Sequence, residues 1–162
     1  MKLVPKKLSI VLILFLFLTG ACKANISRNN DGSLEVETSI TQPQLQDVVS
    51  ASIADPLIKE LTVSLQSGYV LVSGTRERLN DPGKIDSLTF RLDLDVSNGQ
   101  LTTTISNAQL DDVPLEKNRV DHWNETIANR LSNLGSKNPN ATLKSVVVIP
   151  DGVTMTWTVS KQ

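Results

Sequence analysis

The alternation of apolar and polar residues constrains this fold more than any other feature. From Leu88 to Val96 every second residue is apolar, and Asn98-Gly99 follows almost directly. Such a period places successive side chains on opposite faces of a strand, and Asn-Gly is a strong signal for a tight hairpin turn. The chain must therefore contain an antiparallel sheet with one buried face. The pairs predicted on that face are Val96–Leu101, Leu94–Thr103 and Leu92–Ile105.

Two other dipeptides predict hairpins in the same way: Ser67-Gly68 and Asp151-Gly152. After Ile105 the apolar positions move to Ala108 and Leu110, which indicates a bulge. The predicted pairs are Val63–Val72 and Leu65–Val70 around the first turn, and Val148–Met155 and Val146–Trp157 around the second.

Two segments with helical spacing interrupt the strands. Thr41-Gln42-Pro43-Gln44 combines an N-cap hydroxyl, a first-turn proline and a capping-box glutamine, and Asp55-Pro56 ends the short helix that follows. A longer helix is expected to open at Val113-Pro114 and to end at Gly135. This order, with about six to seven strands in three hairpins, predicts an α+β fold. The stripe of the long helix is Val120, Trp123, Ile127, Leu131 and Leu134.

The N-terminus carries the features of a secretory signal peptide, which we assign to residues 1–21. Lysines precede an apolar run from Leu8 to Leu18, and small residues follow it. The run is shorter than the roughly 20 residues that span a bilayer, so a transmembrane anchor is the weaker alternative. Cys22 is the only cysteine, and Leu18-Thr19-Gly20-Ala21-Cys22 resembles the lipobox of bacterial lipoproteins.

That resemblance implies that the Cys22 thiol becomes a diacylglycerol thioether and that acyl chains such as palmitate hold the protein on a bacterial membrane, outside the cytoplasm. The alternative is a soluble exported protein in which Cys22 is a stray thiol. Residues 22–32 are expected to be the lipidated cysteine and a flexible tether, since Ile26 is the only large apolar residue there. Residues 33–162 then form a single domain.

Composition argues against several function classes. Sixteen Lys and Arg against seventeen Asp and Glu give a formal charge of -1, so we expect no nucleic-acid partner. One cysteine and one histidine cannot supply the about four ligands of a structural zinc site. We find no nucleophile elbow, phosphate-binding glycine loop or His-Glu-x-x-His motif. We therefore expect no cofactor, no metal and no enzymatic activity.

The remaining polar candidates are better interpreted as solvated positions. His122 sits one residue away from the apolar stripe of the long helix. Asp93 and Asp95 alternate with apolar residues on the polar face of a strand, and Asp111-Asp112 is typical of a turn. Three glycosylation sequons, at Asn25, Asn124 and Asn140, are discounted in a protein whose signal sequence is bacterial.

The apolar surface between the sheet and the long helix is the last candidate. These residues either form the core or line a groove for an acyl chain, and the sequence leaves both interpretations open. The candidate ligand-binding residues are Phe90, Leu92, Leu94, Trp123, Ile127, Leu131, Met155 and Trp157.

The order of elements from Leu34 to Val159 resembles half of a tubular lipid-binding (TULIP-like) module, as in the YpmS-like and LmeA-like families. The features that carry this resemblance are the helix start at 41–45, the segment from Leu61 to Gly74, and the Asn98-Gly99 hairpin before a long helix. The resemblance implies a strongly curved sheet around a long helix, and a lipid ligand in the apolar seam. The alternative is an envelope interaction or assembly lipoprotein with a closed core, a protein partner and no ligand.

Overall fold

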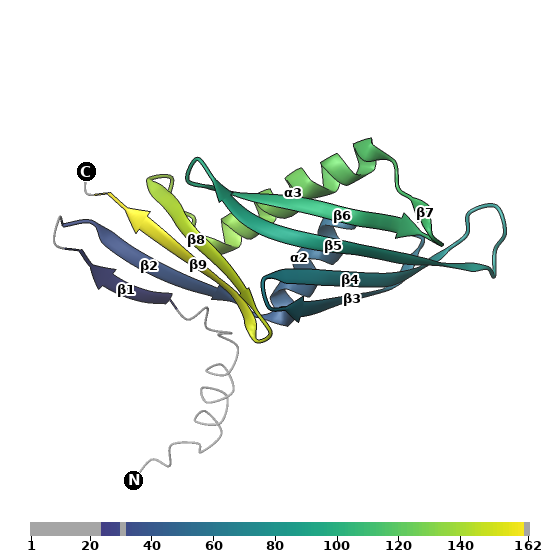
Figure 1. Cartoon of the computed structure of the whole chain (residues 1–162), viewed down its shortest axis with the longest axis horizontal. Helices are drawn as coiled ribbons and strands as arrows, with labels where there is room; N and C mark the ends of the chain where they lie inside the picture. The colour runs from purple at the N-terminus through teal and green to yellow at the C-terminus, as the bar shows by residue number, and fades with distance from the viewer. Residues whose placement is uncertain (1–23, 30–31, 161–162) are drawn as a thin grey trace, which may run out of the picture.

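Two antiparallel sheets carry the fold in this computed structural model, which describes residues 24–29 and 32–160 (Figure 1). The larger sheet has the order β3-β4-β5-β6-β7, and the smaller has the order β1-β2-β9-β8. The larger sheet consists of β3 (Ile58–Gln66), β4 (Tyr69–Glu77), β5 (Ile85–Ser97), β6 (Gln100–Leu110) and β7 (Val113–Pro114). The smaller consists of β1 (Ala24–Arg28), β2 (Leu34–Ile40), β8 (Ala141–Ile149) and β9 (Gly152–Val159).

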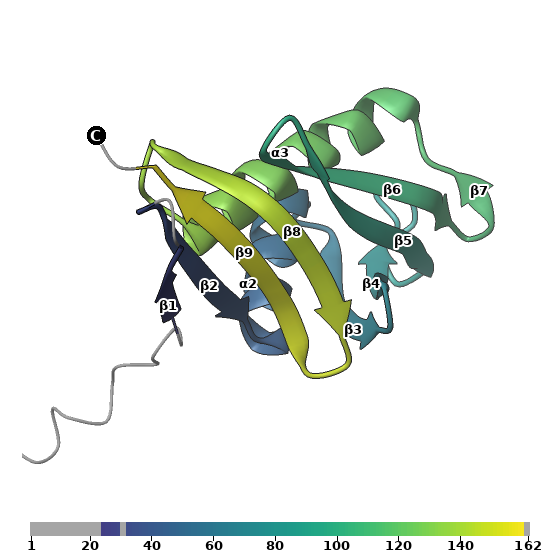
Figure 2. The ribbon, with the colours of Figure 1, turned by 60° about the vertical axis from the view of Figure 1, so that its left-hand side comes forward.

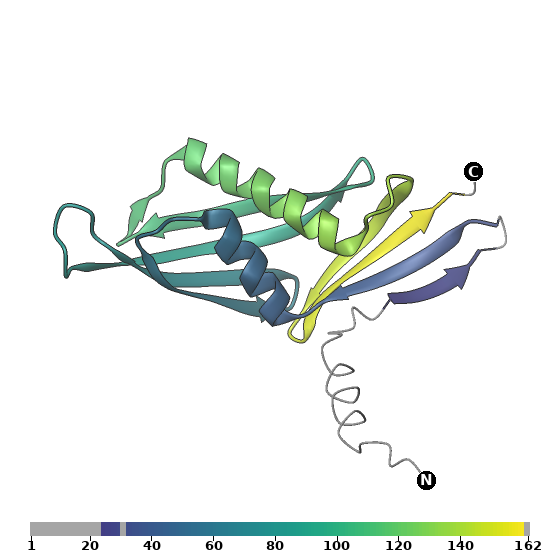
Figure 3. The ribbon, with the colours of Figure 1, turned by 180° about the vertical axis from the view of Figure 1, so that it is seen from behind.

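Two helices, α2 (Gln42–Ile53) and α3 (Lys117–Gly135), lie on the same side of the larger sheet (Figure 3). The α2 capping box is present, with the Thr41 N–H donating to Gln44 Oε1 at 2.9 Å. The prediction that the long helix opens at Val113-Pro114 is wrong, because these two residues pair with β6 as β7. The α+β class with antiparallel pairing is confirmed.

The first two predicted hairpins have the predicted registers. Val63 pairs with Val72 in one, and Leu92 pairs with Ile105 in the other. The bulge is confirmed as well. Thr89 pairs with Gln109 while Arg91 pairs with Ser106, so two residues of β6 lie opposite one residue of β5.

The third hairpin differs from its predicted register by two residues. Val148 pairs with Val153, not with Met155, and the turn consists of Pro150 and Asp151. Gly152 belongs to the strand, and a Cβ there would lie 2.7 Å from the Ile40 carbonyl oxygen. This glycine is therefore required by the close approach of β2. A shift of two residues keeps each side chain on its predicted face.

The smaller sheet corrects two expectations. Residues 24–28, predicted to belong to a flexible tether, form β1 at a sheet edge; Ile26 is 63% exposed there, which is why no buried periodicity marks this strand. Two sheets also replace the single curved one, because β8 runs past the ends of two hairpins without forming a ladder with them (Figure 2). The Gly68 N–H donates to Val148 O, and the Leu143 N–H donates to Gly99 O, each at 2.9 Å.

Side-chain amides from the helices cap both sides of the larger sheet. On β3, the Val63 N–H donates to Gln46 Oε1 at 2.7 Å, and Gln46 Nε2 donates to the Leu61 carbonyl. On β6, the Ile105 N–H donates to Asn124 Oδ1 at 2.8 Å. These contacts satisfy backbone groups that would otherwise face an open edge.

Candidate functional site

The eight side chains predicted to line a ligand seam lie in or against the hydrophobic core. Seven of them are at most 5% exposed, and Leu94 is partly buried against the same cluster. The rings of Phe90 and Trp123 lie 5.9 Å apart between the sheet and α3. Trp157 Nε1 donates to Thr38 Oγ1 at 3.1 Å, which satisfies its buried N–H. These residues fill the seam with protein atoms.

The C-terminal end of α3 is packed tightly against the smaller sheet. Gly135 is buried at the end of the helix, and a Cβ there would lie 2.6 Å from Trp157 Cζ2 and 3.0 Å from Met155 Sδ. The glycine predicted as a helix stop is therefore needed for packing. Leu134, predicted to join the buried stripe, is instead 43% exposed.

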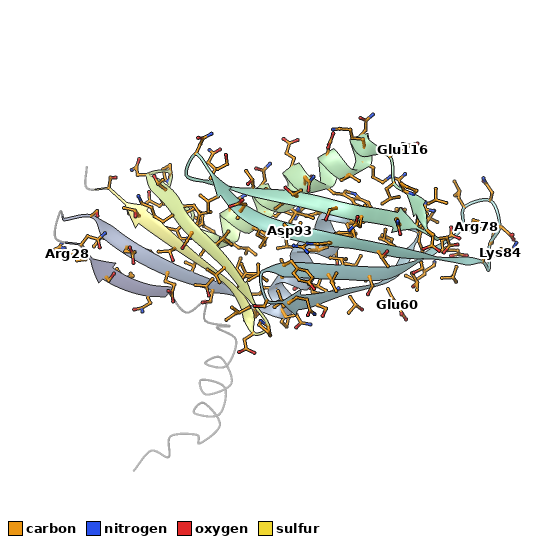
Figure 4. The ribbon with its side chains drawn as sticks, viewed as in Figure 1. Arg28, Glu60, Arg78, Lys84, Asp93 and Glu116 are labelled. Atoms are coloured by element: carbon orange, nitrogen blue, oxygen red, sulfur yellow. The ribbon has the colours of Figure 1, made fainter. Side chains whose placement is uncertain are left out.

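A groove of about 480 Å³ lies on the opposite face of the larger sheet, away from the helices. Its side chains alternate with the buried ones on β3, β4, β5 and β6, and Figure 4 shows Asp93 on this face. We call it the outer-face groove. It is lined by side chains of Ser64, Tyr69, Leu71, Ser73, Thr89, Arg91, Asn107 and Gln109.

Arg91 is held in a fixed orientation at the end of this groove. Its guanidinium carbon lies 4.2 Å from the centre of the Tyr69 ring. Its Nε donates to Asp93 Oδ2 at 2.8 Å and its Nη2 donates to Asp93 Oδ1 at 2.6 Å. The hydrogen bond to Asp93 raises the pKa of Arg91 above its ordinary value. The ring and the carboxylate together fix the plane of the guanidinium group.

The bulge in β6 shapes the other side of the groove. Asn107 has a φ of 52°, in the left-handed region that asparagine tolerates better than most residues. Among residues 24–29 and 32–160, the side chains of Asn107 and Gln109, and those of Ser73 and Thr89 across the groove, have no hydrogen-bond partner. Their hydroxyl and amide groups are available to a ligand.

A cluster of charged side chains lies at the end of the larger sheet where Figure 4 labels Arg78 and Lys84. The guanidinium of Arg78 binds Asp86, whose side chain is buried, and also Asp111 at 3.2 Å. The hydrogen bond from Arg78 lowers the pKa of Asp86. The Ser87 N–H donates to Asp111 Oδ1 at 2.7 Å. These contacts tie the β4–β5 loop to the β6–β7 turn, which indicates a structural role.

The other polar candidates have no special environment. His122 is exposed, Asp93 pairs with Arg91, and the amide of Asn124 is engaged at the edge of β6. In the part of the chain that the structure covers, no group of three or more His, Cys, Asp or Glu residues could hold a metal ion. No helix in that same part is long and apolar enough to cross a membrane. Cys22 and the predicted signal peptide lie outside the described residues.

Comparison with known proteins adds nothing to this site, because no family model, curated protein or solved structure matches the chain. The TULIP-like resemblance stays a prediction. Asp93 was predicted to lie on a polar sheet face, but the outer-face groove was not predicted from the sequence. The signal that could have found it is the chain's only tyrosine, Tyr69, beside the Ser67-Gly68 turn.

Proposed function

We propose that this chain is a non-catalytic lipoprotein of the bacterial envelope, anchored through Cys22, that binds its partner through the outer face of the larger sheet. The observation that supports this proposal is the contrast between the two faces of that sheet. One face is packed against α2 and α3 with a filled seam, and the other has an open groove with unpartnered polar groups. A filled seam favours an interaction domain over a lipid carrier.

The side-chain amides at the edges of the larger sheet also favour binding through its outer face. Strand addition is a common way to recruit a partner, but it requires free backbone groups at a sheet edge. Gln46 and Asn124 occupy such groups on β3 and β6. The broad outer face is therefore the better candidate surface of the larger sheet.

The anchor would also orient the domain. Only Lys23 separates Cys22 from Ala24, where β1 begins. Two residues span at most about 7 Å, so lipidation would hold β1 close to the membrane surface. In Figure 1, β1 belongs to the half of the molecule opposite the β4–β5 loop, so lipidation would leave that loop far from the anchored strand.

Native mass spectrometry tests this proposal against the lipid-carrier alternative. The chain carrying Cys22→Ser is purified from a bacterial host, and its mass is measured with and without added phosphatidylglycerol and phosphatidylethanolamine. We expect the mass of the protein alone under both conditions. A defined adduct of phospholipid mass that disappears on denaturation would contradict the closed core.

Substitutions on α3 provide a matched test. Ile127 is fully buried, whereas Leu134 on the same helix is 43% exposed. A carboxylate at a filled core position is buried without a partner, so Ile127→Asp should unfold the domain. Leu134→Asp should leave it folded. A folded Ile127→Asp variant, seen by circular dichroism, would instead indicate an open seam at that position.

A further inference from the structure

The outer-face groove combines apolar and polar groups in a particular way. Leu71 is 43% exposed and lies directly across from Arg91 in the β4–β5 ladder. Beside them, hydroxyl and amide groups of Ser73, Thr89 and Asn107 face the groove without protein partners in the described part of the chain. A ligand that fits must offer an apolar face and several hydroxyl or amide groups at its edge.

The charged side chains at the outer-face groove limit the class of ligand that it can bind. Among the described residues, Arg91 is the only charged one that lines the groove, and both oxygens of Asp93 already bind it in a two-pronged pair. The pair carries no net charge, so an anionic ligand would have to compete with Asp93 for the guanidinium group. The groove is therefore suited to a neutral ligand.

The flat guanidinium group remains accessible for stacking. Tyr69 lies against one side of it, and the Asp93 carboxylate holds Nε and Nη2. Within the described residues, Nη1 has no hydrogen-bond partner. The group thus presents a rigid plane and a free N–H donor to a ligand at low entropic cost.

We propose that the outer-face groove binds a neutral oligosaccharide chain. A sugar ring has apolar C–H faces and a rim of hydroxyl groups, which matches a surface made of Leu71, the guanidinium plane and unpartnered polar side chains. A volume of about 480 Å³ lies within the usual range of small-ligand sites. This inference rests on the proposed function and names the chemistry that the outer face recognises.

Saturation-transfer difference NMR on the full lipoprotein tests the proposal, in a zwitterionic detergent that has no sugar head group. The probes are two neutral hexasaccharides, maltohexaose and chitohexaose, with hexagalacturonate as the charged comparison. We expect saturable binding of a neutral hexamer and weaker binding of hexagalacturonate. Binding of neither neutral hexamer would overturn the inference, as would preferential binding of hexagalacturonate.

Two asparagines give a matched pair of variants. Asn107 in the groove and Asn98 in the β5–β6 turn both have a φ of 52°, a conformation that glycine adopts readily. Asn107→Gly thus removes the side-chain amide and keeps the backbone conformation. We expect it to weaken saccharide binding about 5-fold or more, as for the loss of one hydrogen bond, and Asn98→Gly to have no effect. Equal affinity in both variants would overturn the placement of the ligand.

Arg91→Lys separates recognition by shape from recognition by charge. Lysine keeps the positive charge but loses the guanidinium plane. We expect this variant to lose saccharide binding about 5-fold or more. Full binding by Arg91→Lys would contradict the proposed stacking. These outcomes are distinct from failure of the proposed function, which a phospholipid adduct in the mass spectrum would indicate.

Discussion

Gln46 gives the most specific prediction about what holds the larger sheet together. Its amide accepts a hydrogen bond from the Val63 N–H at 2.7 Å and donates another to the Leu61 carbonyl, so one side chain satisfies two backbone groups at the edge of β3. Gln46→Ala removes both bonds. It also leaves part of the strand edge open to another chain.

The expected cost follows from these two contacts. A typical hydrogen bond contributes about 1 kcal/mol to stability, which gives about 2 kcal/mol for the pair. Alanine has a better helix propensity than glutamine by a few tenths of a kcal/mol, so the net loss should be about 1.5 kcal/mol. Gln42→Ala removes a single bond, from Nε2 to the Val63 carbonyl at 2.9 Å, and should cost about 1 kcal/mol.

Urea unfolding followed by tryptophan fluorescence measures these losses, and size-exclusion chromatography measures self-association through the exposed edge. Asp47→Ala is the matched control, because Asp47 is the next residue on the same helix and is exposed. It should change the free energy of unfolding by less than about 0.5 kcal/mol. If Gln46→Ala proves as stable as Asp47→Ala, the capping of β3 by this amide contributes nothing to the free energy of unfolding.

Three other predictions concern separate parts of the chain. Gly135→Ala should destabilise the domain by about 1–3 kcal/mol in urea despite alanine's better helix propensity, because its Cβ would clash with Trp157; a gain in stability would contradict this packing. Arg78 lowers the folded-state pKa of Asp86, so the stabilisation from this ion pair is present above the unfolded-state pKa of about 3.9 and is lost as pH falls through the folded-state pKa. The difference in unfolding free energy between the wild type and Asp86→Asn should therefore shrink in acid, and a difference that stays constant with pH would contradict a stabilising pair. Cys22→Ser should move the protein from the membrane to the soluble fraction, and unchanged membrane retention would argue against lipidation.

Strand pairing could be predicted wherever the turn residues and the alternating pattern agreed. The Asn98-Gly99 and Ser67-Gly68 turns have positive φ glycines, and their hairpins have the predicted registers. Gly152 misled the prediction because a glycine required by a close approach between strands looks the same in sequence as a turn glycine. β1 was missed because an edge strand without buried side chains has no hydrophobic period.

The candidate site was harder to predict than the fold. Seven of the eight apolar residues proposed from the sequence are deeply buried, but periodicity alone cannot distinguish a core from a groove. The outer-face groove depends on Arg91, whose guanidinium group contacts both Tyr69 and Asp93. It also depends on Asn107, whose backbone adopts the left-handed conformation at a bulge. The contact between Arg91 and Tyr69 joins residues on neighbouring strands, so it becomes visible only once the strands are placed side by side.

The seam between α3 and the two sheets is filled with protein atoms, and the chain carries its own probes for it. Its two tryptophans, Trp123 and Trp157, both lie in that seam and are 4% and 5% exposed. The decisive measurement titrates the Cys22→Ser chain with a short-chain phosphatidylcholine brominated on its acyl chains, against the same lipid without bromine. A closed core predicts identical tryptophan emission with both lipids, whereas saturable quenching by the brominated lipid alone would place an acyl chain in the seam and contradict a closed core.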